Sequence, residues 1–207
     1  MPRMRRHRIP RRVREFSIRF VVVTAVLLAL GRLYGPVAVT PILPGIAWMI
    51  EAVDDHLRVD KIAVVDRPTN SQIELKVTPI RVLVIGGHVM TPDPTVYFEP
   101  KTLVGSVLQP VILFLAIILA WPGGIQALSA RLLLAVPASL LLVAIDTPLG
   151  LVGGMRDYRP YLRNVPFDPL VSWNDFLQSG GPLVLAIAAG VLVISATERW
   201  NKSSPEP

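Results

Sequence analysis

The chain has 207 residues, of which 52% are hydrophobic and only 17% are charged, and its mean hydropathy is +0.51. A soluble domain of this length rarely carries so much apolar content, because folding cannot bury it all. Cysteine is absent, which excludes disulfides, thiol nucleophiles, iron–sulfur clusters and cysteine-type zinc sites.

The net charge of +6 comes largely from the amino-terminal tail, residues 1–19. A basic cluster beside an apolar run is typical of a cytoplasmic tail that meets anionic lipid headgroups. Nucleic-acid binding is not expected, because no recognition motif accompanies the charge. The tail contains eight arginines: Arg3, Arg5, Arg6, Arg8, Arg11, Arg12, Arg14 and Arg19.

The first apolar run, residues 20–39, has about the twenty residues needed to cross a bilayer core. A cleaved signal peptide is the competing interpretation. No small-x-small cleavage site follows the run, and Arg32 and Pro36 lie where one would be expected. We therefore expect an uncleaved transmembrane helix.

Residues 40–101 change in character and predict a small α+β domain outside the membrane. Leu43 to Val53 predicts a short amphipathic helix at the outer membrane surface, with Trp48 at the level of the headgroups. Three strands with one apolar face are near the minimum for independent stability, so we expect this domain to lean on the membrane or on a partner.

The three strands are predicted at Leu57 to Val65, Ile73 to Val77 and Arg81 to Ile85. The second alternates apolar with charged residues, as a half-buried strand does. The stretch DRPTNS between the first two is rich in turn-forming residues and predicts a hairpin.

Three further apolar runs, residues 103–121, 127–149 and 180–197, predict three more transmembrane helices. A proline inside the first of them, Pro110, is tolerable in a membrane helix whose neighbours satisfy the freed carbonyl. The sequence thus predicts a membrane all-α bundle of four transmembrane helices with a small strand-rich extracytoplasmic domain between helices 1 and 2. A loop, residues 150–179, and a short tail, residues 198–207, complete the chain.

The distribution of basic residues predicts the orientation. The amino-terminal tail, Arg131 in the short turn region, and Arg199 and Lys202 at the carboxyl end favour the cytoplasm for both termini. The loop 150–179 also carries arginines and mildly opposes this assignment. We expect a multi-pass protein of the bacterial inner (cytoplasmic) membrane, with both long segments in the periplasm.

Two charged residues fall inside the predicted membrane helices, Arg32 and Asp146. At 1.5 Å per residue they lie at depths of roughly 18 Å and roughly 21–28 Å from the cytoplasmic side. The similar depths predict an ion pair, direct or through water. The alternatives are that each side chain snorkels separately to the outer interface, or that the two serve catalysis or transport.

The loop 150–179 interleaves aromatic residues with arginines, a composition that suits a peptide partner or a lipid headgroup. The simpler interpretation is an interfacial stretch anchored by its aromatic side chains. The binding candidates are Arg156, Tyr158, Arg159, Tyr161, Arg163 and Trp173.

Catalytic and cofactor motifs are missing from the sequence. His56 and His88 lie near acidic residues, but their spacing matches no compact metal-ligand motif, and we expect neither a metal nor a cofactor. No nucleophile elbow, phosphate-binding loop or dinucleotide fingerprint occurs. A single intramembrane carboxylate, Asp146, does not make an aspartyl protease. The protein is not expected to be an enzyme.

The layout resembles the exosortase H-associated membrane proteins. The resemblance rests on the order of parts and on two stretches, VYFEPKTLVGSVLQPVILFLAIILA before and through the second helix and LQSGGPLVLAIAAG entering the fourth. It implies a role as an accessory to an exosortase, the membrane enzyme that processes C-terminally tagged exported proteins. Without cysteine, this chain is not the cysteine-dependent exosortase itself.

We therefore expect a non-enzymatic accessory or scaffold subunit with a membrane-protein partner, possibly an exosortase, in the lipid bilayer. A structural subunit of another multi-protein membrane complex is an alternative. A small transporter or membrane enzyme using Arg32 and Asp146 is a third hypothesis, and it predicts a polar cavity that reaches those residues.

Overall fold

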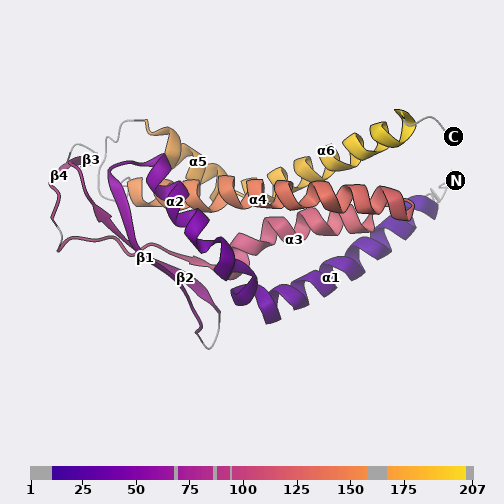
Figure 1. The fold of residues 1–207 in the computed structure, drawn as a ribbon, viewed down its shortest axis with the longest axis horizontal. Coiled ribbons are helices and arrows are strands. Elements are labelled where there is room, and N and C mark those ends of the chain that lie inside the picture. The colour runs from indigo at the N-terminus through magenta and orange to yellow at the C-terminus, as the bar shows by residue number, and fades with distance from the viewer. Residues whose placement is uncertain (1–10, 68–69, 86–87, 94, 158–166, 204–207) are drawn as a thin grey trace, which may run out of the picture.

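The computed structural model describes residues 11–67, 70–85, 88–93, 95–157 and 167–203. It consists mainly of helices, with a small antiparallel sheet at one end of the helical bundle (Figure 1). The helices are α1 (Arg11–Val39), α2 (Leu43–Val53), α3 (Val104–Ala120), α4 (Ile125–Arg156), α5 (Pro169–Gln178) and α6 (Gly181–Ser203); a 3₁₀ turn, η1 (Thr40–Ile42), joins α1 to α2.

Three of the helical segments are long enough and apolar enough to cross a membrane: Val13–Val53, Ile125–Arg156 and Gly181–Trp200. They indicate a membrane protein in a lipid bilayer. The helix α3 is also apolar, but its 17 residues span only about 26 Å, less than a typical bilayer core of about 30 Å. The structure thus supports three of the four membrane-crossing helices that the sequence predicts.

The helices extend beyond the predicted runs. The first begins at Arg11 rather than at residue 20, and the ring of Phe16 stacks on Phe20 with centroids 6.0 Å apart. The third run continues from residue 149 to Arg156, because Gly153 lets α4 lie against α5. The predicted loop 150–179 therefore contains the end of α4 and the whole of α5.

The main sheet has the order β1-β2-β5, with β1 (Leu57–Val65) and β2 (Gln72–Pro79) forming the predicted hairpin. The third strand is β5 (Lys101–Leu103), which pairs with the start of β2. The segment Arg81 to Ile85 was expected to be that third strand. Instead, β3 (Leu83–Ile85) pairs only with β4 (His88–Met90) in a separate two-stranded sheet.

The sheet shares one apolar core with the helices. Ile73, Leu75 and Val77, the alternating apolar residues of β2, are buried together with Ile50 of α2 and Val152 of α4. A second cluster, around Phe114 and Ile118 of α3, lies deeper in the bundle and joins α3 to α4 and α6. The outer domain therefore leans on the helical bundle, as its small size predicts.

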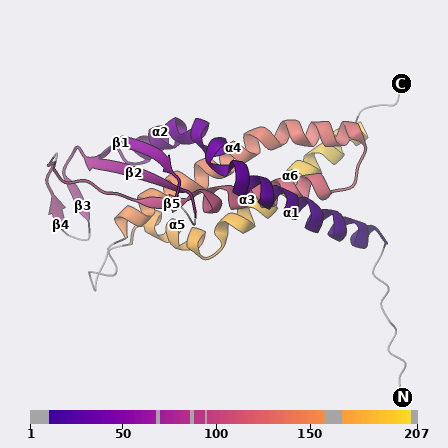
Figure 2. The ribbon, with the colours of Figure 1, turned by 90° about the horizontal axis from the view of Figure 1, so that it is seen from below.

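The two ends of the molecule differ in composition. At one end lie the sheet, α2 and α5. At the other end lie the start of α1, the end of α6 and the turn between α3 and α4 (Figures 1 and 2). Below, these are called the sheet end and the terminal end.

Candidate functional site

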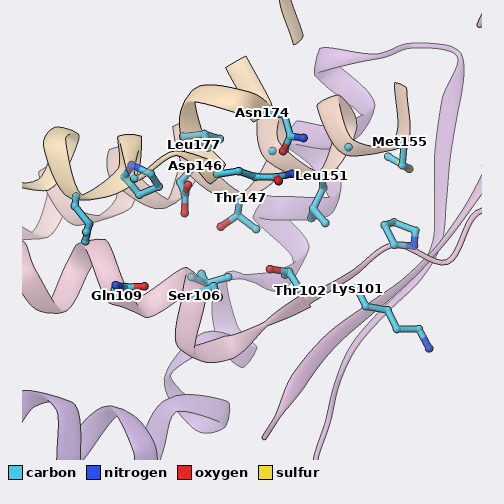
Figure 3. A pocket seen from close by; sticks show the side chains of 18 of the residues that line it. Lys101, Thr102, Ser106, Gln109, Asp146, Thr147, Leu151, Met155, Asn174 and Leu177 are labelled. Carbon is cyan, nitrogen blue, oxygen red and sulfur yellow. The ribbon is translucent and has the colours of Figure 1, made fainter. Parts of the chain in front are cut away.

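A pocket of about 760 Å³ opens at the sheet end, between the first turns of α3, the second half of α4 and the α5–α6 connection (Figure 3). Asp146 lies in its wall on α4, beside Thr147. Across the pocket lie Ser106 and Gln109 of α3, and Asn174 approaches from α5. Polar side chains from three helices thus converge on one space.

Thr147 is 5% exposed, and its Oγ1 is buried without a hydrogen-bond partner among the described residues. A threonine in a helix usually donates to a carbonyl one turn back. Thr197 of α6 does so, with its Oγ1 2.8 Å from the oxygen of Ile194 and 3.0 Å from that of Val193. The hydroxyl of Thr147 therefore retains unused hydrogen-bonding capacity beside the pocket.

The walls of the pocket also include apolar side chains. Val107, Leu151, Met155, Leu177 and Leu183 line it along with the polar groups. The space is therefore amphipathic. It has two carboxylates, those of the half-buried Asp146 and the exposed Glu99, together with several neutral hydrogen-bonding groups and a hydrocarbon surface beside them.

Arg32 lies in a different pocket of about 540 Å³, between α1, α3 and the β1–β2 turn region. The ion pairs found in the described parts of the chain do not join Arg32 to Asp146. Because α1 packs chiefly on α3, and α3 packs on α4, α3 lies between the two charges. Gln109 of α3 lines both pockets, so an indirect connection between Arg32 and Asp146 stays a prediction.

A second polar cluster joins the outer domain to α4 and α5. The guanidinium of Arg156 donates to Oδ2 of Asp54 from Nη2 at 2.6 Å and from Nε at 3.1 Å. Its Nη1 lies 3.5 Å from Oδ2 of Asp168, which caps α5 by accepting from the backbone N–H of Leu170. Arg156 therefore ties together the ends of α2 and α4 and the start of α5.

Asp54 ends α2 and is 2% exposed. Burial alone favours the neutral acid, but hydrogen bonds from Arg156 and from the backbone N–H of His56 outweigh it. The pKa of Asp54 consequently lies below its ordinary value, and the carboxylate is held ionised.

Asp54, Asp55 and His56 bring three potential metal-ligand atoms within 4.8 Å of one another. Nδ1 of His56 lies 3.1 Å from Oδ1 of Asp54 and 3.0 Å from Oδ1 of Asp55. Asp54 already pairs with Arg156, and Asp55 pairs with Arg81. These ion pairs explain why the three side chains lie close together at the end of α2.

Two of the six partner-binding candidates lie in the described structure. Arg156 is occupied by Asp54 and Asp168, so its role is internal. Trp173 stacks on Phe176 with centroids 5.1 Å apart, and its Nε1 donates to the oxygen of Ile145 at 3.4 Å. The other four, Tyr158, Arg159, Tyr161 and Arg163, lie outside the described residues.

Sequence reasoning missed the structural role of Arg131, which it used only as an indicator of orientation. Arg131 is 2% exposed, and its Nη1 donates to the carbonyl oxygen of Trp121 at 3.1 Å. Its guanidinium also reaches the oxygen of Pro122 and the hydroxyl of Thr197. A buried cation at the end of α3 compensates carbonyls that the helix itself leaves unpaired.

No protein-family model matches this sequence, and no curated protein or solved structure shows significant similarity to it. The resemblance to the exosortase H-associated membrane proteins therefore stays a prediction.

Proposed function

We propose that this protein is a non-catalytic accessory subunit of a multi-protein complex in the bacterial cytoplasmic membrane. In this proposal α3 crosses the bilayer as the fourth helix, both termini are cytoplasmic and the outer domain lies in the periplasm. The partner proposed first is an exosortase-type enzyme. A subunit of another membrane complex is the alternative.

The observation that carries the proposal is the unequal burial of the three long helices. None of the most apolar 18-residue stretch in the α1 segment is buried, compared with 22% in α4 and 33% in α6. On its inner side α1 approaches α3 closely, because a Cβ on Gly31 would meet Ile112 at 2.9 Å. Its outer side remains free for a transmembrane helix of a partner.

The outer domain supports the same proposal. Its sheet is fixed to the bundle by the shared core and by the Arg156–Asp54 pair. A partner bound to α1 in the membrane and to the sheet outside would therefore meet two surfaces of fixed relative position, as a scaffold requires.

The transporter or enzyme hypothesis predicts a polar cavity that reaches Arg32 and Asp146. The described structure places them in two pockets on different sides of α3. This arrangement favours the accessory role over proton or substrate transfer between the two residues.

Site-specific photo-crosslinking in the native membrane tests the proposal. A photoreactive residue at Leu33 or Val37 of α1, 70% and 72% exposed, should capture a membrane protein. The same residue at Leu192 of α6, 69% exposed, is the matched control and should capture mainly lipid.

Mass spectrometry then identifies the captured protein. An exosortase-type enzyme would support the first proposal, and recurrent subunits of another complex would support the alternative. If α1 and α6 positions give the same lipid adducts, and purification in mild detergent yields the chain alone, the accessory role is wrong.

A further inference from the structure

We propose that the pocket at Asp146 binds a primary ammonium group, with the ethanolamine headgroup of a membrane phospholipid as its source. This inference goes beyond the accessory role, and it rests on the topology of that proposal for the position of the pocket in the membrane. It rests on the charge, the hydrogen-bonding groups and the shape of the pocket.

The charge of the pocket favours a cation. Asp146 has no ion-pair partner among the residues that the structure describes. Lys101 lines the pocket, but its side chain points away from it in Figure 3, and its Nζ lies 3.4 Å from Oε1 of Glu74. Arg156 is held by Asp54 and Asp168. A half-buried carboxylate without a counter-charge is costly, so a bound cation would stabilise it.

The hydrogen-bonding groups favour an ammonium. A primary ammonium presents three N–H donors. Asp146 offers a carboxylate, Thr147 an unpartnered hydroxyl oxygen, and Gln109 and Asn174 amide oxygens, all along the same pocket. The buried hydroxyl of Thr147 is an independent indication of a ligand, because buried polar groups in native proteins are nearly always paired.

Other cations fit less well. Calcium takes six to eight oxygen ligands, and magnesium requires a compact octahedral set. The carboxylates that line this wide pocket are those of Asp146 on α4 and of the exposed Glu99 before β5. A quaternary ammonium such as choline is recognised by an aromatic cage. Phe98 is the only aromatic residue among those described as lining the pocket.

The size and position of the pocket favour a lipid source. About 760 Å³ is far more than an ammonium alone requires. The pocket extends beyond the polar groups along the apolar side chains of Leu151, Leu177 and Leu183, which leaves room for the glycerol and the first carbons of the acyl chains, beyond the phosphate. The pocket also lies at the sheet end of the bundle, close to where the proposed topology puts the outer headgroup layer.

The test uses the purified full chain in detergent, titrated with short-chain phosphatidylethanolamine and followed by tryptophan fluorescence. Trp173 is a suitable reporter, because its indole donates to the carbonyl of Ile145, next to Asp146. Phosphatidylethanolamine should bind at least tenfold more tightly than phosphatidylcholine or phosphatidylglycerol with the same chains.

Variants assign the binding to the pocket. Asp146→Asn should weaken phosphatidylethanolamine binding at least tenfold, and Thr147→Val should weaken it several-fold. Asp55→Asn is the matched control, because Asp55 is an exposed carboxylate at the sheet end that does not line the pocket, and it should change the affinity less than twofold. A thermal melt establishes that each variant is folded.

A second arm separates the sources of the ammonium. Decylamine that binds with the same dependence on Asp146, while phosphatidylethanolamine does not bind, would support the ammonium site and overturn the lipid source. Equal binding of all three phospholipids, or unchanged binding in a folded Asp146→Asn variant, would overturn the proposal. If Asp146→Asn does not fold, selectivity in the unmodified protein and the effect of Thr147→Val decide.

Discussion

An arginine lies toward each end of α4, Arg131 buried and Arg156 half-buried, and the two have different kinds of partner. At the terminal end, Arg131 donates to two backbone carbonyls and a threonine hydroxyl, all of them neutral. At the sheet end, Arg156 meets the carboxylates of Asp54 and Asp168.

The difference reflects what each arginine holds in place. Arg131 donates to the free carbonyls at the end of α3, which lies close to it in the sequence. Arg156 joins α4 to Asp54, which is 102 residues away in sequence, and to Asp168 at the start of α5, and both partners are side chains. Neutral acceptors suffice to finish a helix, whereas charge pairing specifies how distant elements dock.

The largest expected effect comes from breaking the pair at the sheet end. Asp54→Asn leaves Arg156 without its buried partner, and removing one member of a buried pair costs about 3 kcal/mol of the free energy of unfolding. Chemical unfolding in detergent, followed by circular dichroism, measures the loss. Asp55→Asn is the control, since Asp55 is 65% exposed and should change stability by less than about 1 kcal/mol. Equal losses in the two variants would contradict a special role for Asp54.

Removing the arginine at the terminal end should cost less. Arg131→Met keeps most of the buried volume but leaves the carbonyls of Trp121 and Pro122 without their donor, which costs about 2 kcal/mol. Arg199→Met, at an exposed position near the end of α6, is the control for loss of positive charge. The same unfolding measurement applies, and a stability equal to that of the Arg199 variant would show that the carbonyl contacts are dispensable.

A pair of neighbouring glycines tests how closely α4 and α5 pack at the sheet end. A Cβ on Gly153 would collide with the carbonyl oxygen of Leu170 and lie 2.8 Å from Cβ of Asn174, so Gly153→Ala should destabilise by about 1–2 kcal/mol. Gly154 has no atom within 4 Å of such a Cβ, so Gly154→Ala should instead stabilise the helix by up to about 1 kcal/mol. Thermal melts of the two variants should shift in opposite directions.

The smallest expected effect comes from lowering the pH, which should destabilise the sheet end before the terminal end. The pKa of Asp54 in the folded protein is below its ordinary value of 3.8, so its ion pair contributes stability above about pH 4 and loses it as the pH falls further. The acceptors of Arg131 do not titrate. Limited proteolysis between pH 5 and pH 3 should therefore cut the outer domain before the terminal end. In Asp54→Asn this acid sensitivity should be smaller, and the remainder should come from Asp60 and Glu74 of the sheet, whose pKa values are also lowered by their hydrogen-bond partners.

The sequence predicts local structure best where periodicity and turn residues agree. The bounds of α2 and β1 match their predicted ranges, and β2 contains the predicted alternation of Ile73, Leu75 and Val77. The sequence did not predict β5, because its three residues lead into an apolar helix and carry no strand pattern of their own.

The candidate site was harder to predict, because its contacts are long-range. Depth along two helices placed Arg32 and Asp146 at similar levels, but depth does not show which helices are neighbours, and α3 separates them. The Arg156–Asp54 pair forms because α4 continues to Arg156. The predicted helix ended at residue 149, so Arg156 was expected in a loop. The intramembrane charge of Asp146 was the one signal that pointed to the pocket.

The shortness of α3 has a consequence for the surrounding lipid. A lone helix of about 26 Å would force the bilayer to thin around it, at a cost that grows with each ångström of hydrophobic mismatch. Here α3 packs on α1, α4 and α6, so protein rather than lipid surrounds most of it. If α3 crosses the bilayer as proposed, the longer helices set the thickness of the adjoining membrane, and α3 carries Pro110 and its short span without deforming it.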